Sequence, residues 1–192
     1  MTGTAVRLVV VAVGLEPTAR QLFGGHKARA LPRAGVAPPR PFEGALFGLF
    51  GSLSRGDVVG LVIPGVWRGP AAYGGPAAAS PLLAVRDHVN LALRGPLTGR
   101  WPAGVPRSFP CLTGIYQPAV VRALGGASVY SEDVVVAGVA DSGRLTPFEL
   151  GALDEVGAAA YADCLVPAVV VAAFHGLRVA ACVVPQAARE RE

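Results

Sequence analysis

One stretch of the chain, residues 84–99, constrains the fold more than any other. An apolar run leads into a tight polar cluster of Arg86, Asp87, His88 and Asn90, after which proline and glycine interrupt the chain. This order is typical of a buried strand that carries polar side chains at its carboxyl end, where ligands bind in open α/β sheets. A second interpretation stays open, in which the polar side chains only hydrogen-bond one another at the strand end.

The rest of the chain alternates between strand-like and helix-like patterns. Thr146 predicts a helix start as the N-cap residue, with Pro147 in the first helical position and Glu149 in the third. Gly157 suits the end of that helix. Expected strands cover residues 5–13, 27–32, 57–63, the segment before Arg86, 133–139, 158–162 and 177–184, and expected helices cover 18–23, 43–53, 113–124 and 146–157. This alternation predicts an α/β fold with a mostly parallel central sheet flanked by helices on both faces.

The composition is that of a folded chain and excludes several classes of protein. The 192 residues are 52% hydrophobic and 16% charged, which fits one domain over residues 1–192 with a substantial buried core. The basic residues are scattered and do not alternate with aromatic residues, so nucleic-acid binding is not expected despite the net charge of +4. The apolar segment 5–13 is too short to cross a membrane, so no membrane association is expected.

Cysteine and histidine usage argues against metal sites and disulfides. Cys111, Cys164 and Cys182 share no spacing typical of metal ligands, and their odd number argues against a disulfide framework. The three histidines are well separated, so a zinc site is not expected either. We therefore expect a cytoplasmic protein that holds no metal ion and no other cofactor.

The stretch 84–99 also resembles a signature of the purine nucleoside phosphorylases. That family carries an Asp-His-Ile-Asn-Leu strand end followed by a Pro-Leu-x-Gly turn, and the same order is kept here by Asp87, His88, Asn90, Leu91, Pro96, Leu97 and Gly99. Weaker resemblances cover residues 31–39, 112–118, 146–149 and 157–179. The resemblance implies a single-domain nucleoside phosphorylase-like fold that assembles as a trimer or as a hexamer of trimers. It also implies a domain that stops short of a further helix of the family.

Several positions that the resemblance assigns to phosphate differ from the family pattern. Val13 stands where the first phosphate loop has a serine, and therefore offers no hydroxyl. In the Pro-Arg-His-Gly segment Arg33 is kept, but Ala34 replaces the phosphate-binding histidine. Arg33 is thus a candidate for anion binding, and an ordinary surface role for it stays open.

The positions that the resemblance assigns to the nucleoside differ as well. Arg144 and Leu145 stand in place of the Tyr/Phe-Glu pair that stacks on and hydrogen-bonds the purine. Asp163 replaces a ribose-contacting methionine, Cys164 replaces the serine after it, and Ala187 replaces a base-contacting asparagine. Phosphorolysis needs a positioned phosphate and a donor for the departing base. Ordinary purine phosphorolysis is therefore not expected.

The remaining polar residues are candidates for a different site. Asp163 and His88 are the candidate catalytic residues, and Arg144, Asp141 and Cys164 are candidate ligand-binding residues beside Arg33. Each has a plainer alternative. Asp163 either accepts sugar-like hydroxyls or caps the helix after it, and His88 either acts as an acid or base or belongs to a structural strand-end network. We expect His175 to interact with the dipole at a helix C-terminus.

Three functions stay open at this point. The first is a divergent member that binds, and in a stronger form also transforms, a nucleoside-like or other small polar metabolite. The second is a catalytically silent subunit that assembles with an active relative or a pathway enzyme. The third is a retained nucleoside phosphorylase or N-glycosidase activity. The first requires a closed pocket with polar groups. The second is favoured if Ala, Leu and Val side chains fill that pocket or if it lies open at an interface. Apolar surface on the Gly- and Ala-rich helices further predicts a homotrimer.

Overall fold

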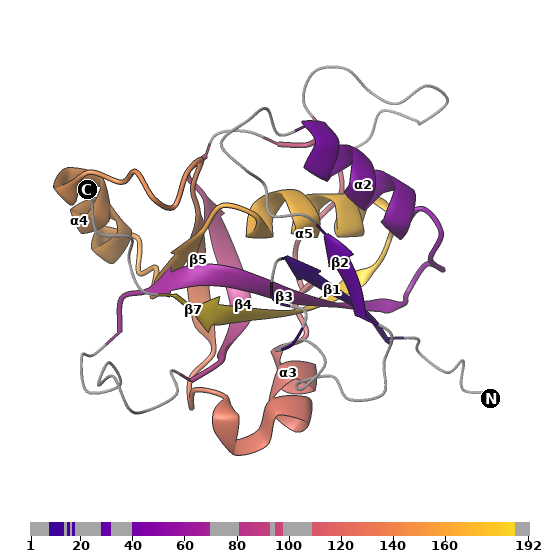
Figure 1. The fold of residues 1–192 in the computed structure, drawn as a ribbon, viewed down its shortest axis with the longest axis horizontal. Helices are drawn as coiled ribbons and strands as arrows, with labels where there is room; N and C mark the ends of the chain where they lie inside the picture. Colours follow the sequence, from indigo (N-terminus) through magenta and orange to yellow (C-terminus); the bar gives the residue numbers. More distant parts are fainter. Residues whose placement is uncertain are drawn as a thin grey trace.

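The computed structural model describes residues 8–13, 15, 17, 28–31, 40–69, 81–92, 95–97 and 109–186. These residues form a mixed α/β domain (Figure 1). Its strands are β1 (Leu8–Val13), β2 (Ala28–Leu31), β3 (Val58–Trp67), β4 (Leu83–Asn90), β5 (Val134–Gly138), β6 (Ala160–Ala162) and β7 (Arg178–Pro185). Its helices are α2 (Arg40–Phe50), α3 (Pro118–Gly125), α4 (Pro147–Glu155) and α5 (Leu165–Phe174), with a short 3-10 turn at Gly126–Ser128.

The strands close into a barrel, which the expected open sheet did not anticipate. Within the described part of the chain, β3, β6, β5, β4 and β7 form a ring, and β1 and β2 extend from β3. Most pairings are parallel, but β6 runs antiparallel to β3 and β7 runs antiparallel to β4. The predicted central sheet is thus a closed barrel with mixed strand directions, in which most but not all neighbouring strands are parallel.

The closure depends on the long strand β3. Its first part pairs with β1 and β7, and its last residues, Val66 and Trp67, pair with β6. Gly65 lies between these two parts, where a Cβ atom would come within 2.7 Å of a Val183 methyl group and 2.9 Å of the Tyr161 carbonyl oxygen. A side chain at this position would therefore push the strands of the barrel apart.

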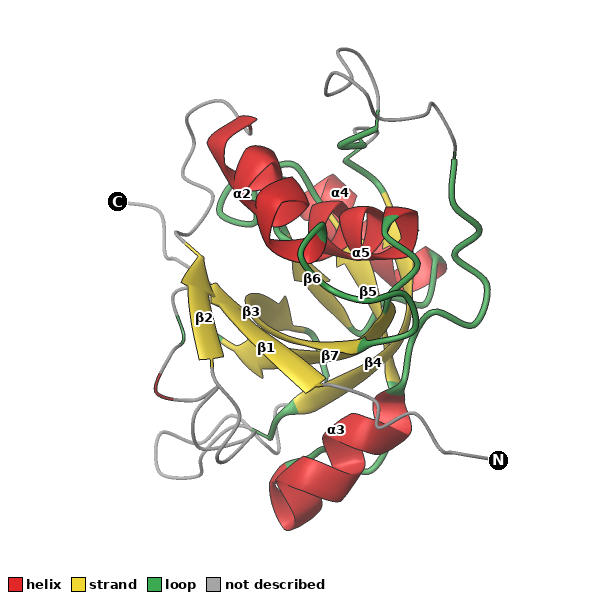
Figure 2. Ribbon diagram, turned by 90° about the vertical axis from the view of Figure 1, so that its right-hand side faces the viewer, coloured by secondary structure: helices red, strands yellow, loops and turns green. Residues whose placement is uncertain are grey.

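Helices cover the barrel from opposite sides. Figure 2 shows α2 and α5 on one side of the strands and α3 on the other. The largest core cluster lies under α2 and α5, and it includes the fully buried Leu46, Phe50 and Leu165. A separate cluster around Leu153 joins α4 to β5 and β6. The two clusters lie on different faces of strands β5 and β6.

Several element boundaries agree with the sequence and others do not. Helix α2 covers residues 40–50 rather than 43–53, and β3 extends to residue 67 rather than 63. Helix α4 begins as predicted, because Thr146 and Glu149 form a reciprocal capping box, and Gly157 follows its end with a φ of 69°. Helix α3 begins at Pro118 rather than at residue 113, because residues 115–117 are extended and hydrogen-bond to Val179 of β7. Strand β4 continues to residue 90, so the polar cluster lies inside the strand rather than after it. The short helix expected at 18–23 lies outside the described residues.

Candidate functional site

The carboxyl ends of three parallel strands meet at one edge of the barrel. Asn90 of β4 pairs with Gly138 of β5, which in turn pairs with Ala162 of β6. The chain leaving β4 stays close to its neighbour, because two successive backbone N–H groups after Asn90 donate to the Gly138 carbonyl oxygen at 2.9 Å. The N–H of Val139 donates to the Ala162 carbonyl oxygen at 3.0 Å. This strand-end edge is the kind of place where ligands bind in α/β sheets.

A tight turn places two predicted residues just beyond β5. Asp141 Oδ1 accepts a hydrogen bond from the Gly143 N–H at 2.9 Å, and its Oδ2 lies 3.2 Å from Arg144 Nε. The Arg144 side chain is 73% exposed, so this ion pair lies in water. An exposed pair of this kind contributes about 0.2–1 kcal/mol at most. The turn therefore owes its shape mainly to the local hydrogen bonds of Asp141.

Beyond this turn lies a pocket of about 340 Å³. Its walls come from the residue after β4, from the β5–α4 loop and from one side of α4. The polar lining residues are Asp141, Arg144 and Glu149, and the apolar ones are Leu91, Val139, Ala140, Leu145, Ala152 and Leu153. The pocket thus combines apolar walls with a few charged groups, as small-molecule sites do.

Two residues that the sequence did not assign to a site hold the α4 wall in place. Arg68, at the end of β3, donates to the Leu150 carbonyl oxygen at 2.6 Å and pairs with Asp154 Oδ2 at 2.7 Å. Glu149 both lines the pocket and completes the capping box, where hydrogen bonds from Thr146 lower the pKa of its carboxyl group. The capping pattern could have identified Glu149, whereas no local pattern points to Arg68.

Asp163 lies just after β6 and is tied to the loop that forms the pocket. Its Oδ2 accepts from the Ser142 hydroxyl at 3.3 Å, and its Oδ1 accepts from Cys164 Sγ at 2.9 Å. The helix-capping interpretation is wrong, because Cys164 is the N-cap of α5 and makes no side-chain cap hydrogen bond. Asp163 is only partly buried, whereas Cys164 is fully buried. Cys164 therefore contacts Asp163 from within the core.

His88 lies on the other face of the strands, away from the pocket. It is in register with Val136, which belongs to the core cluster under α5, whereas the pocket is lined by Val139 and Leu153 of the cluster beside α4. His88 Nδ1 lies 2.8 Å from the Tyr116 hydroxyl oxygen. The structure therefore brings Asp141 and Arg144 together in one pocket but places His88 elsewhere.

No family model matches this chain, and no curated protein matches it in sequence. Similar solved structures are those of Schistosoma mansoni purine nucleoside phosphorylase. The complex with a monocyclic inhibitor has 15% sequence identity and a TM-score of 0.66, with coverage of 94% of this chain and 80% of that one.

Two further complexes of Schistosoma mansoni phosphorylases give the same picture. The complex with inosine has 13% identity and a TM-score of 0.67 over 97% of this chain and 79% of that one. The isoform 2 complex with cytosine and ribose-1-phosphate has 16% identity and a TM-score of 0.59, over 94% of this chain and 76% of that one. This chain has the purine nucleoside phosphorylase fold. At such low identity the likeness concerns the fold alone.

Within this phosphorylase-like fold, the polar cluster on β4 makes one hydrogen bond within itself and one contact to a residue of another segment. Asp87 Oδ1 accepts from the backbone N–H of His88 at 2.8 Å, and the His88 ring instead contacts Tyr116. Burial lowers the pKa of His88, and this effect outweighs the opposing negative charge of Asp87. The His88 imidazole is therefore neutral at neutral pH, and its partner comes from a distant segment.

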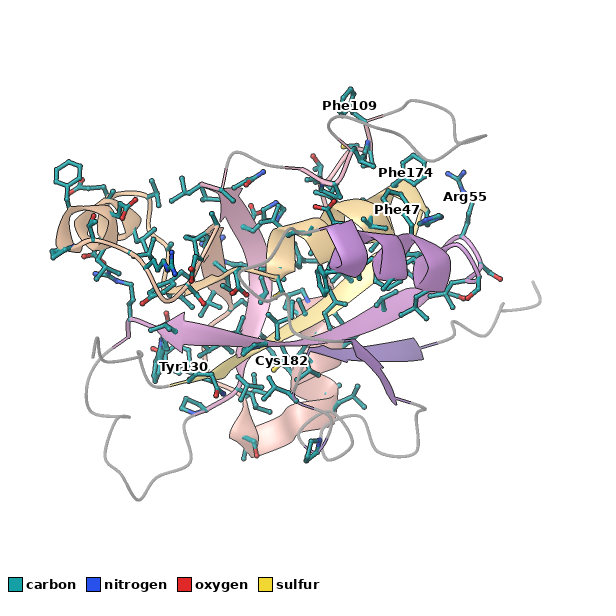
Figure 3. All side chains as sticks on the ribbon, turned by 45° about the horizontal axis from the view of Figure 1, so that its top comes forward. Phe47, Arg55, Phe109, Tyr130, Phe174 and Cys182 are labelled. Atoms are coloured by element: carbon teal, nitrogen blue, oxygen red, sulfur yellow. The ribbon has the colours of Figure 1, made fainter. Side chains whose placement is uncertain are left out.

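His175 occupies the expected position at the end of α5, but its ring packs against aromatic residues. It is the C-cap residue of α5, as predicted, and its ring lies 5.9 Å from that of Phe47 and 5.2 Å from that of Phe174. Figure 3 shows the two phenylalanines side by side near Arg55. Burial lowers the pKa of His175, whereas a helix C-terminus would raise it. The expected charge–dipole interaction is therefore weak, and aromatic packing dominates.

Some predicted positions cannot be placed. Arg33, Ala34 and Ala187 lie outside the described residues. Among the residues that are described, no group of three or more His, Cys, Asp or Glu side chains could hold a metal ion. The helices in those same parts of the chain are all too short or too polar to cross a membrane.

Proposed function

We propose that this protein binds a nucleoside-like or other small polar metabolite at the strand-end edge of β4, β5 and β6. One observation carries the proposal. Arg144 and Leu145, at the two positions where the family resemblance implies contacts to the purine, both line the pocket of about 340 Å³. A volume of this size suits a ligand of one or two rings.

The known ligands of proteins with this fold support the same class of compound. The Schistosoma mansoni phosphorylases have been solved in complexes with adenosine and with inosine, and a schistosome enzyme in complex with hypoxanthine. For this chain we propose the class of compound only, because the family resemblance implies a different polar lining. A guanidinium at Arg144 donates hydrogen bonds, whereas Asp141 and Glu149 accept them.

Asp163 is the candidate contact to ligand hydroxyl groups. Its carboxylate is held at the edge by Ser142 and Cys164 and is partly exposed. A carboxylate accepts hydrogen bonds from two neighbouring hydroxyls, and such charge-assisted bonds are stronger than neutral ones. We therefore assign Asp163 the role of a ligand-binding residue, and any reaction at this edge would use its carboxylate as the base.

The alternative of a silent subunit is less well supported. It is favoured by a pocket that Ala, Leu and Val side chains fill or that lies open at an interface, whereas three charged residues line the pocket that the structure contains. Retained phosphorolysis is also less well supported, because Leu145 offers no hydrogen bond to a departing base. Binding of a metabolite without ordinary phosphorolysis is the function that fits the pocket best.

A titration with inosine, and separately with D-ribose, tests this proposal. We expect binding in the micromolar to millimolar range, a loss of at least tenfold in D163A and R144Q, and an unchanged melting temperature in both variants. Glu155→Gln is the matched control, because Glu155 is an exposed residue on α4 outside the pocket. Absence of binding to the unmodified protein, or equal losses in E155Q, would contradict the proposal.

We further propose that the protein assembles as a homotrimer in the cytoplasm. Phe148 is 88% exposed and Phe109 is 79% exposed, and large apolar side chains of this kind are common at subunit contacts. Light scattering coupled to gel filtration checks the assembly. A monomer at micromolar concentration would contradict it.

A further inference from the structure

The charges that line the pocket do not cancel. Among the described lining residues, Asp141 and Glu149 are acidic and Arg144 is basic, so the lining has one carboxylate more than it has cations. The whole chain, by contrast, has a net charge of +4. The charge at the pocket is therefore opposite in sign to that of the molecule.

Asp141 and Arg144 neutralise each other within their turn. Asp141 Oδ2 lies 3.2 Å from Arg144 Nε, and the backbone N–H of Arg144 donates to the Asp141 carbonyl oxygen at 3.3 Å. Among the described residues, Asp141 is the only polar partner of the Arg144 side chain, and it engages Nε alone. The terminal nitrogens of the guanidinium keep their N–H groups for an acceptor on a ligand. The pair thus adds donors to the pocket without adding net charge.

Glu149 has no cation beside it. Its Oε2 accepts both hydrogen bonds of the capping box, from the Thr146 backbone N–H at 2.7 Å and from the Thr146 hydroxyl at 2.8 Å. These neutral donors lower the pKa of the carboxyl group, so Glu149 is ionised at neutral pH. Within the described part of the chain Glu149 forms no ion pair, and the capping box does not use its Oε1. One carboxylate oxygen is therefore left for a ligand.

Other charges on and beside α4 do not remove this excess. The positive end of the helix dipole lies near Glu149 and is equivalent to about half a unit charge, so it offsets only part of the carboxylate. Arg68 pairs with Asp154 at 2.7 Å, so its charge is neutralised there. Glu155 is a further exposed carboxylate on the same helix, outside the pocket. Figure 1 shows α4 standing apart from the other helices, so no helix packed against it supplies a cation.

We propose that Glu149 sets the charge preference of the pocket, which takes ligands whose ring system carries an amino group or a positive charge and disfavours anionic ligands. This inference rests on the proposed function and narrows its class of compound. The apolar walls, which include Leu91 and Leu145, suit the rings of such a ligand. A hydrogen bond from an amino group to an ionised carboxylate is stronger than a neutral one, and an anion would meet a like charge.

The charge of the pocket is tested first, without any ligand. Two nitroxides of the same shape, one cationic and one anionic, relax nearby backbone amides in proportion to their local concentration. We expect the cationic nitroxide to relax the amides of Leu91 and Ala140, at the strand-end wall of the pocket, more strongly than the anionic one. Glu149→Gln keeps an oxygen for the capping box and removes the charge, so it should reduce this difference by about half or more.

Glu155→Gln is the matched control for this measurement, because it removes the same charge from the same helix outside the pocket. It should change the relaxation of the Leu91 and Ala140 amides much less than E149Q does. Stronger relaxation of these amides by the anionic nitroxide would overturn the inference, and so would equal effects of the two variants.

The ligand class is tested next with 1-methyladenosine, which is a cation at pH 7, with neutral adenosine and with anionic adenosine 5′-monophosphate. We expect the cation to bind about tenfold more tightly than the monophosphate at low ionic strength, with adenosine between them, and 1 M salt to narrow the gap. E149Q should narrow it as well, and E155Q should not. Tighter binding of the monophosphate, or a gap that E149Q leaves unchanged, would overturn the inference. If none of the three bound, the proposed function would fail, and the relaxation data would still decide whether Glu149 sets the charge of the pocket.

Discussion

Two regions at the same strand-end edge hold their polar groups in opposite ways. On the pocket side, defined by residues 139–153, Asp141, Arg144 and Glu149 are charged, largely exposed and paired with residues two or three positions away. On the pair side, defined by His88 and Tyr116, the groups are neutral, partly or fully buried and joined across 28 positions. The same strands, β4 to β6, support both regions on their two faces.

This difference in burial decides which polar residues can be substituted without loss of stability. Exposed charges cost little free energy when they are replaced, so the pocket side can vary its ligand chemistry without loss of the fold. A buried hydroxyl that loses its acceptor costs about 1–3 kcal/mol, so the pair side is constrained by folding. We therefore expect residues on the pocket side to determine which ligand binds. We expect the residues on the pair side to stabilise the fold.

The same contrast explains what could be predicted from the sequence. Helix α4 and its capping box depend on neighbouring residues, so local patterns sufficed to predict the helix. Asp141 and Arg144 were selected through the family resemblance instead, and the turn that holds them is also local. The barrel closure, the clamp by Arg68 and the partner of His88 depend on distant contacts. Hydrophobic periodicity does not encode such contacts. For this reason Arg68 was not singled out, and Tyr116 was not identified as the partner of His88.

The largest effect we predict is on catalysis and concerns the pocket side. With inosine and excess phosphate, the protein should release no hypoxanthine above background. Leu145 lines the pocket and has no hydrogen-bonding group, and removal of one such contact to a transition state costs about 10²–10³ in rate. The measurement is a coupled assay for hypoxanthine, with a purine nucleoside phosphorylase as the positive control. Robust phosphate-dependent release would show that other residues had taken over these roles.

The next effect tests whether the pocket side depends on the core rather than on its charges. Leu153 is 1% exposed and both lines the pocket and packs in the cluster beside α4. Leu153→Ala should lower the free energy of unfolding by about 2–5 kcal/mol. Chemical denaturation measures this loss, and Leu124→Ala is the control because Leu124 is 40% exposed. Equal effects of the two variants would mean that α4 is not held by its buried face.

A smaller loss is expected from the cap of the same helix. Thr146→Ala removes the hydroxyl that accepts from the Glu149 N–H at 3.2 Å and donates to Glu149 Oε2 at 2.8 Å. The free energy of unfolding should fall by about 1 kcal/mol. Thr146→Ser keeps the hydroxyl and should retain most of the stability in the same denaturation experiment. If T146S lost as much as T146A, the methyl group rather than the capping box would be responsible.

The smallest effect we predict is on the pH dependence of stability, which differs between the two regions. Burial lowers the pKa values of His88 and His175 below 6.5, so the unfolded chain binds more protons than the folded chain just below that pH. Their contribution to stability is therefore complete above pH 6.5 and decreases as the pH falls from there. Hydrogen bonds from Thr146 lower the pKa of Glu149 below 4.5, so its contribution is complete above pH 4.5 and is lost as the pH falls through the folded-state pKa.

Melting temperatures measured from pH 8 to pH 3 should therefore fall in two stages that belong to different faces of the same strands. The double variant H88Q/H175Q removes both titrating groups of the α5 face, so it should flatten the first stage and leave the second. T146A removes the side-chain hydrogen bond that lowers the Glu149 pKa but keeps the backbone N–H of residue 146, so it should weaken the second stage in part and leave the first. If either variant changed the melting temperature equally in both stages, the two regions would be coupled through the strands. The pocket side and the pair side would then not contribute to stability independently.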